Sequence, residues 1–307
     1  MLFNRVLVTG ANGLLGQALV RRLCREREYD VLATARDDAP RFELESCGYA
    51  PLDVTQPAEI TQIFEDFTPN VVVNCAAMSD VAECDEHRSE AWATNARAVK
   101  TLAKRCREHR ARLVQVSSDF VFNGKRGPYD EEARPDPVNY YGRTKLAGEN
   151  AVREAGRSNW AIARTVLLYG TGQDLTRSNI VLWIVDQLSD GDPLHIVDDQ
   201  YRTPTHVEDL ADGIERLIRQ DETGIYHLSG PDLVSIYELA CTVAEVFGLD
   251  ASLIEPVSSD FFEDDVERPP RTGFVLDKAK ADLDYDPRSL EDGLRDLQAS
   301  LQGFSSG

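Results

Sequence analysis

The sequence predicts an α/β fold: a doubly wound parallel sheet of the Rossmann type with a smaller C-terminal domain. Short β-branched runs alternate with helical segments in the first half of the 307 residues, which is the pattern of repeated strand–helix–strand units. The first run, residues 5–9, leads into a glycine-rich turn and an apolar-periodic helix. Beyond Gly170 this rhythm loosens. We therefore expect residues 1–165 to form the sheet domain, with about 206–228 returning to it, and the rest of 166–307 to form the smaller domain.

The chain is strongly acidic, with 53 Asp and Glu against 33 Lys and Arg and a formal net charge of −20. A field of that sign repels phosphate, so we expect neither a nucleic-acid partner nor an anionic membrane surface. Adaptation of the source organism to salt would explain the acidity. In that case the thermal stability should rise between low and molar salt, and an unchanged melting temperature would refute the idea.

Six cysteines are scattered along the chain without a Cys-x-x-Cys pair. That spacing argues against a zinc site, and we expect no metal. Several of these cysteines sit in apolar runs as small core residues, which is typical of a reducing compartment. The N-terminus reaches a charged Arg5 early and contains no long apolar segment. We therefore expect a cytoplasmic protein without a signal peptide or a membrane span.

The glycine-rich turn is Gly10-Ala11-Asn12-Gly13-Leu14-Leu15-Gly16. Glycines let a backbone approach a pyrophosphate closely, and the helix that follows offers free N–H groups at its positive end. Its place between a strand and a helix is what a dinucleotide fingerprint requires, although the spacing is Gly-x-x-Gly-x-x-Gly. A plain glycine turn is the alternative. The predicted cofactor contacts here are Gly10, Asn12, Gly13, Leu14, Leu15 and Gly16.

The end of the second strand predicts which dinucleotide binds. Arg36 lies twenty residues after Gly16, where a carboxylate would bind a ribose 2′-hydroxyl and an arginine a 2′-phosphate. This favours NADP(H), although Asp37 and Asp38 follow directly and either could reverse the choice. A solvated surface arginine is the alternative.

Two later strand ends supply further cofactor contacts. Asp53 and Val54 follow a short strand, where the carboxylate could accept from an adenine amino group or begin the turn into the next helix. The strand that starts at Val71 ends in the small residues Cys75, Ala76 and Ala77, which would let a cofactor pack closely.

Tyr141 and Lys145 carry the predicted chemistry. Residues four apart lie on one face of a helix, and a nearby cation lowers the pKa of a phenol, which is ordinarily near 10. The pair therefore suits a general acid that protonates a carbonyl. The strand ending at Ser118 could supply a hydroxyl that binds the same carbonyl. An ordinary amphipathic helix is the alternative.

Four stretches together resemble the extended short-chain dehydrogenase/reductases, and more narrowly the dTDP-4-dehydrorhamnose reductase branch. They are residues 8–16, 74–77, 117–124 and 141–149. Residues 197–200 and 203–205, and Arg268-Pro269, also match this branch.

The resemblance implies that Tyr141 protonates the keto oxygen while the hydride comes from NADPH. It also implies that Lys145 binds the nicotinamide ribose and lowers the tyrosine pKa, that Ser118 orients the carbonyl, and that Asn95 joins a proton relay. For Asn95 an exposed polar residue is the alternative. The residues expected to contact the substrate are Ser79, Asp119, Phe120, Gln200 and Arg202, and for Arg202 a structural salt bridge is equally plausible.

Two departures from the branch bear on the substrate. Phe120 stands where the branch usually has Tyr, and Arg164-Thr165-Val166-Leu167 replaces its usual Arg-Thr-Ser-Trp, which removes an aromatic platform. The expected reaction is NADPH-dependent reduction of a 4-keto nucleotide sugar, first of all dTDP-4-dehydro-rhamnose to dTDP-rhamnose.

Two other functions stay open. Residues 204–209 and 226–230 look like the non-catalytic, NADP-binding beta regulatory subunit of methionine adenosyltransferase. A nucleotide-sugar epimerase or dehydratase of the same superfamily would keep NAD bound, against which Arg36 argues. A homodimer is a further expectation that nothing in the sequence specifies.

Overall fold

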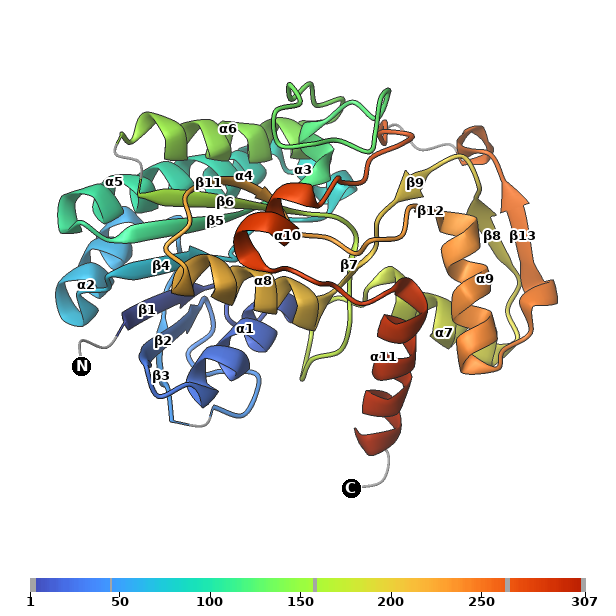
Figure 1. The fold of residues 1–307 in the computed structure, drawn as a ribbon, viewed down its shortest axis with the longest axis horizontal. Helices are drawn as coiled ribbons and strands as arrows, with labels where there is room; N and C mark the ends of the chain where they lie inside the picture. Colours follow the sequence, from blue (N-terminus) through green and yellow to red (C-terminus); the bar gives the residue numbers. More distant parts are fainter. Residues whose placement is uncertain (1–3, 45, 157–158, 263–265, 305–307) are drawn as a thin grey trace.

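The computed structural model describes residues 4–44, 46–156, 159–262 and 266–304. At the centre of this part of the chain is a seven-stranded parallel sheet in the order β11-β6-β5-β4-β1-β2-β3 (Figure 1), which confirms the predicted doubly wound sheet. Its order reverses between β1 and β4, and ligands of such sheets bind outside the carboxyl ends of the strands at that point. The strands are β1 (Asn4–Thr9), β2 (Tyr29–Ala35), β3 (Gly48–Pro51), β4 (Val71–Asn74), β5 (Arg112–Ser118), β6 (Trp160–Thr165) and β11 (Gly224–His227).

Helices cover both faces of this sheet because its strands are apolar on both sides. In β1, Val6 and Val8 point into one core and Leu7 into the other. The core of Val6 and Val8 contains α1 (Leu14–Arg25), α8 (Val207–Arg219) and α10 (Asp277–Leu283); the core of Leu7 contains α2 (Pro57–Phe67), α5 (Val99–His109) and part of α6 (Tyr140–Glu154). Two short helices, α3 (Val81–Glu86) and α4 (Arg88–Trp92), lie beside α6 (Figure 1).

The smaller domain has a hydrophobic core of its own, which includes Tyr169, Ile184, Leu239 and Leu294. Its strands pair two by two rather than in one sheet. They are β7 (Leu168–Tyr169), β8 (Leu194–Val197), β9 (Tyr201–Arg202), β10 (Thr205–His206), β12 (Val234–Ser235) and β13 (Ile254–Val257), and its helices are α7 (Ile180–Asp190), α9 (Ile236–Phe247) and α11 (Leu290–Phe304). Helix α9 begins with a capping box, in which Ser235 and Glu238 each accept from the other's backbone N–H.

The chain passes between the domains more than once. The segment 206–228 supplies α8, which packs beside α1, and β11, which pairs with β6 at the edge of the large sheet. Residues Phe274, Leu276 and Tyr285, which we placed in the smaller domain, also lie in a core of the sheet domain. They do so because α10 covers β11 and α8.

Two short elements and one π-helical turn of the fold lack a clear signal in the sequence. β13 is four residues long and contains Glu255 and Pro256, and α10 is short and largely polar, so neither carries a strong periodic signal. Between α4 and α5 the chain forms a π-helical turn, η1 (Ala93–Ala98), rather than a continuous α-helix. Such turns are frequent at functional sites.

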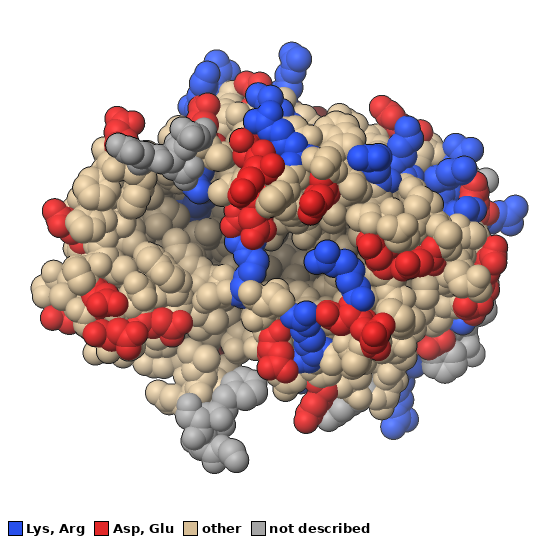
Figure 2. Space-filling view, turned by 180° about the vertical axis from the view of Figure 1, so that it is seen from behind, with Lys and Arg blue, Asp and Glu red and all other residues tan. Residues whose placement is uncertain are grey.

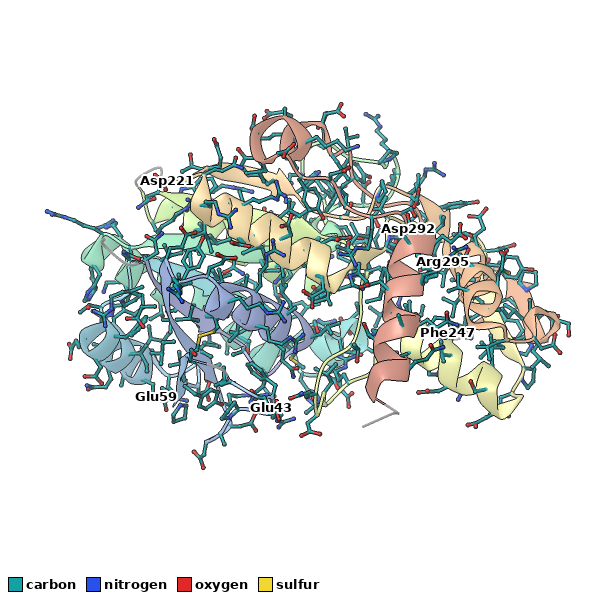
Figure 3. The ribbon with its side chains drawn as sticks, turned by 60° about the horizontal axis from the view of Figure 1, so that its bottom comes forward. Glu43, Glu59, Asp221, Phe247, Asp292 and Arg295 are labelled. Carbon is teal, nitrogen blue, oxygen red and sulfur yellow. A yellow bond between two sulfur atoms is a disulfide. The ribbon has the colours of Figure 1, made fainter. Side chains whose placement is uncertain are left out.

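Two of the six cysteines are disulfide-bonded, which their spacing in the sequence did not predict. Cys24, near the end of α1, and Cys47, just before β3, form a disulfide with Cα atoms 6.0 Å apart (Figure 3). The pair forms because α1 packs beside the connection from β2 to β3. Cys75, Cys84, Cys106 and Cys241 are free. The cysteines therefore no longer argue for a reducing compartment.

The surface agrees with the composition. Acidic side chains are spread over the face in Figure 2, with Lys and Arg interspersed. Among the described residues, no helix combines the length and the apolar character needed to cross a lipid bilayer.

Candidate active site

Ser118, Tyr141 and Lys145 come together at the carboxyl end of β5. Ser118 is the last residue of β5, Tyr141 lies in the first turn of α6, and Lys145 lies one turn later. All three are buried, and the Ser118 hydroxyl is close enough to that of Tyr141 to lower the tyrosine pKa. Gly142 allows this close approach, because a Cβ there would meet the backbone oxygen of Phe120 at 2.1 Å.

The pKa of Tyr141 is raised, contrary to the expectation that Lys145 lowers it. Burial is the main cause, the charge of Asp119 adds to it, and only the Ser118 hydroxyl opposes it. Lys145 is not among the groups that shift this pKa, and its Nζ donates to the Val116 backbone oxygen at 2.8 Å. A phenol with a raised pKa stays protonated at neutral pH, which suits a proton donor.

Lys145 titrates closer to neutrality. Burial lowers its pKa to about 8, against the opposing charge of Glu149. We expect turnover to decline as the pH rises through about 8, because the ammonium that would face the cofactor is then lost. A pH profile of kcat/KM checks this, with Lys145→Arg as the comparison because arginine stays charged. If the alkaline decline is unchanged in Lys145→Arg, it belongs to another group.

Asn95 is buried in the π-helical turn, and the structure gives it partners other than Lys145. Its Nδ2 donates to the Met78 backbone oxygen at 2.9 Å and to Thr144 Oγ1 at 3.0 Å, and its Oδ1 accepts from the Met78 N–H at 3.0 Å. It thus joins the segment after β4 to the helix that carries Tyr141. The alternative, that Asn95 is an exposed polar residue, is wrong. The relay role remains a prediction.

The glycine turn lies against the end of β4, as the small residues there suggested. Gly10 has a φ of +69°, and a Cβ on it would meet Ala76 N at 2.6 Å. Gly13 precedes α1 without a side-chain cap, so the first N–H groups of α1, from Leu14 to Gly16, are available to an anion. Cys75 and Ala77 flank Ala76 in the same segment. These residues fit the pyrophosphate of a dinucleotide.

The segment after β2 is held over this turn. Asn12 Nδ2 donates to Asp37 Oδ2 at 2.7 Å, and Arg41 pairs with Asp37 Oδ1 at 2.8 Å. These two partners lower the pKa of Asp37, Arg41 first. Arg36 is exposed beside them. The Asp37 carboxylate is already bonded to Asn12 and Arg41, which makes it less available to a ribose 2′-hydroxyl. This favours the prediction that Arg36 binds a 2′-phosphate.

Asp53 stabilises the turn into the next helix, which was the second of the two roles considered for it. Its Oδ1 accepts from the Thr55 N–H at 2.8 Å and from Thr55 Oγ1 at 2.7 Å. Val54, beside it, is buried. Contact of either residue with adenine remains a prediction.

A cavity of about 1210 Å³ begins beside Ser118, where Asp119 and Phe120 line it, and extends along the smaller domain. Gln200 and Arg202 also line it, whereas Ser79 is exposed and is not among its lining residues. Contact of these residues with a substrate remains a prediction. Figure 2 shows this face hollowed between the two domains, with Lys and Arg side chains at the hollow. No motif in the sequence pointed to the lining residues just before Arg268, which are Ser259, Asp260, Phe262, Val266 and Glu267.

Asp119 connects Ser118 to the C-terminal part of the chain. Its Oδ1 accepts from Ser118 Oγ at 3.0 Å, its Oδ2 accepts from the Thr272 hydroxyl, and Arg202 Nε lies 3.9 Å from Oδ2. Burial raises the pKa of Asp119, and these three neighbours oppose the rise, Arg202 most. The contact between Arg202 and Asp119 is a structural salt bridge, which was one of the two roles considered for Arg202. Thr272 had no signal in the sequence.

Several known proteins are similar to this chain. A probable low-salt glycan biosynthesis reductase of Haloferax volcanii is 31% identical over 303 residues, which cover 97% of this chain and 99% of the relative. A dTDP-4-keto-6-deoxy-D-glucose reductase of Streptomyces niveus is 36% identical and covers 84% and 83%. Methionine adenosyltransferase 2 subunit beta of Xenopus laevis is 35% identical and covers 84% and 76%.

The fold agrees with these relatives. The crystal structure of dTDP-4-dehydrorhamnose reductase from Bacillus anthracis in complex with NADP matches with a TM-score of 0.87 and 29% identity, covering 97% of this chain and 99% of the other. The family model described as RmlD substrate binding domain matches residues 4–302. The chain therefore belongs to the RmlD family, which it shares with the dTDP-4-dehydrorhamnose reductases.

Proposed function

We propose that this protein is an NADPH-dependent reductase of a 4-keto nucleotide sugar, with dTDP-4-dehydro-rhamnose as the first substrate to test. The observation that carries the proposal is the position of Ser118, Tyr141 and Lys145. They lie between the glycine turn, which fits a dinucleotide, and a cavity of about 1210 Å³. The reductases among the relatives, one of them in complex with NADP, support it.

In this mechanism the chain places a proton donor beside the reacting carbonyl. NADPH, when bound, supplies the hydride. Tyr141, kept protonated by its burial, gives its proton to the keto oxygen. Ser118 aligns that oxygen with Tyr141, for which its hydroxyl must turn from Asp119 toward the substrate. The Lys145 ammonium would hold the nicotinamide ribose.

The cofactor preference can be tested at Arg36. We expect Arg36→Ala to weaken NADPH binding roughly ten- to a hundredfold, since a hydrogen bond to a charged group contributes about 1.5–3 kcal/mol. NADH binding should barely change, because NADH has no 2′-phosphate. Fluorescence titration of both cofactors measures this, with Arg25→Ala, at the far end of α1, as the matched control. Equal losses for the two cofactors would remove Arg36 from this role.

A non-catalytic regulatory role is the second candidate, because a methionine adenosyltransferase beta subunit is as similar to the chain as the reductases are. The decisive experiment follows NADPH oxidation by the purified protein with dTDP-4-dehydro-rhamnose. Rapid turnover establishes the reductase. Tight NADPH binding without turnover of this or another 4-keto nucleotide sugar would favour the regulatory role. Sedimentation of the same sample tests the proposed homodimer, and fractionation of the source cells tests a cytoplasmic location.

A further inference from the structure

An ion pair and two hydrogen bonds link four of the polar residues that line the cavity. These contacts start at Asp119, beside Ser118, and reach Arg202 across 3.9 Å. Arg202 Nη2 donates to Gln200 Oε1 at 3.2 Å, and Gln200 Nε2 donates to Ser259 Oγ at 2.9 Å. The cavity therefore runs from the catalytic hydroxyls to the turn η4 (Ser259–Phe261) that follows β13.

The two ends of the cavity each have one aromatic side chain among the described lining residues. Phe120 lies at the catalytic end, edge-on to Tyr141 with ring centroids 5.8 Å apart. Phe262 lies at the other end, next to η4. If the reacting sugar lies at Tyr141, the rest of a nucleotide sugar extends toward Phe262.

Phe262 presents an aromatic surface that is not buried in the protein. It is 45% exposed, although a phenylalanine is ordinarily well buried. Its neighbour Phe261 is 56% exposed, but that ring stacks on His195 with centroids 4.9 Å apart and is not among the lining residues. The ring of Phe262 meets Phe261 edge-on, at an interplanar angle of 84°.

The turn that carries Phe262 is fastened in place. Asp199 accepts from the Ser259 N–H at 2.9 Å and from Ser259 Oγ at 2.6 Å. With the bond from Gln200, three hydrogen bonds fix η4 to the connection between β8 and β9. Phe262 therefore stands at the end of the cavity on an ordered turn, which limits the entropy that a ligand must remove.

Two cations lie between these ends. Arg202 is 3% exposed and lines the cavity together with Arg268, and the two guanidinium groups are close enough to influence each other's charge. Asp119, Asp260 and Glu267 line the same cavity, so its wall carries both signs of charge. In a nucleotide sugar the diphosphate separates the sugar from the base, and the two arginines are the lining groups of opposite charge to it.

We propose that Phe262 stacks on the base of a nucleoside diphosphate and thereby fixes the nucleotide end of the substrate. The assignment of the two ends rests on the proposed function. Stacking on a single ring suits any base, so the neighbouring Asp260 and Glu267 would discriminate between bases by accepting from their N–H groups.

Calorimetric titration of the full chain with dTDP tests this without any keto sugar. We expect Phe262→Ala to weaken dTDP binding about tenfold, and Phe262→Trp to retain it, because stacking needs a π-face. Phe262→Leu should resemble Phe262→Ala. Phe261→Ala, the matched control, should change the affinity by no more than about twofold. Inorganic pyrophosphate should bind wild type and Phe262→Ala alike.

The outcomes separate this proposal from the proposed function. A dTDP affinity that depends on Phe262, without turnover of any keto sugar, would keep the base site and refute the reductase. Turnover of dTDP-4-dehydro-rhamnose with a dTDP affinity that Phe262→Ala leaves unchanged would keep the reductase and refute the base site. Failure of wild type to bind dTDP, UDP and GDP would also refute the base site.

Discussion

Replacing Tyr141 by phenylalanine should lower kcat/KM for the keto sugar by about a thousandfold, since a positioned general acid contributes roughly 10²–10⁴-fold. The change removes one oxygen from a buried site and leaves the ring, so NADPH binding should remain close to that of wild type. Following NADPH oxidation at saturating cofactor, beside a cofactor titration, measures both.

Tyr140→Phe is the matched control. Tyr140 is the neighbouring residue, but its hydroxyl donates to the Arg88 backbone oxygen at 3.2 Å and lies away from Ser118. It should retain near-normal turnover. If Tyr141→Phe keeps more than about a tenth of wild-type activity, the proton comes from elsewhere, because such a loss falls below the usual contribution of a general acid.

Replacing Arg164 by methionine should have the largest effect on stability. Arg164 and Glu149 are both fully buried, and the guanidinium donates to both carboxylate oxygens, at 2.8 and 2.7 Å. Removing one partner of such a pair leaves an uncompensated buried charge, at a cost of about 3–5 kcal/mol. Urea unfolding of the two proteins measures the loss.

Arg153→Met removes the partly exposed partner of the same carboxylate, Glu149. Arg153 also donates to Glu149 Oε2, at 2.6 Å, but it is about one-third exposed, so its loss should cost no more than about 1 kcal/mol. If the two variants lose equal free energy of unfolding, burial is not the reason why the Arg164–Glu149 pair stabilises the protein. The double variant Arg164→Met with Glu149→Leu should recover part of the loss, because neither member of the pair is then left buried without the other.

The sequence was sufficient for the sheet and for the parts of the site that local chemistry determines. The glycine turn, the small residues after β4 and the Tyr141–Lys145 spacing each combine residue type with position in a strand–helix unit, and the parallel order then brings these ends together. The cavity end was not predictable in this way. Thr272 bonds to Asp119, which lies 153 positions earlier, and Phe262 lines a cavity together with residues of distant segments, so nothing in their own neighbourhood marks them.

The Tyr141 pKa shows a different limit. Spacing alone placed a lysine one turn from the tyrosine, but it could not show that the amine donates to the Val116 backbone oxygen. The direction of a side chain depends on the nearest acceptors, which come from β5 rather than from α6. Similarly, Cys24 and Cys47 are 23 residues apart in sequence, and only the packing of α1 brings them together.

The return of the C-terminal segment to the sheet domain has a consequence for synthesis of the protein. The edge strand β11 is not made until residue 224, and α10, which covers it, is not complete until Leu283. A ribosome therefore has to translate most of the chain before the first domain can close its core, although that domain begins at residue 4. Nascent chains halted near residue 165 should expose an open β6 edge, and such edges attract chaperones or other strands.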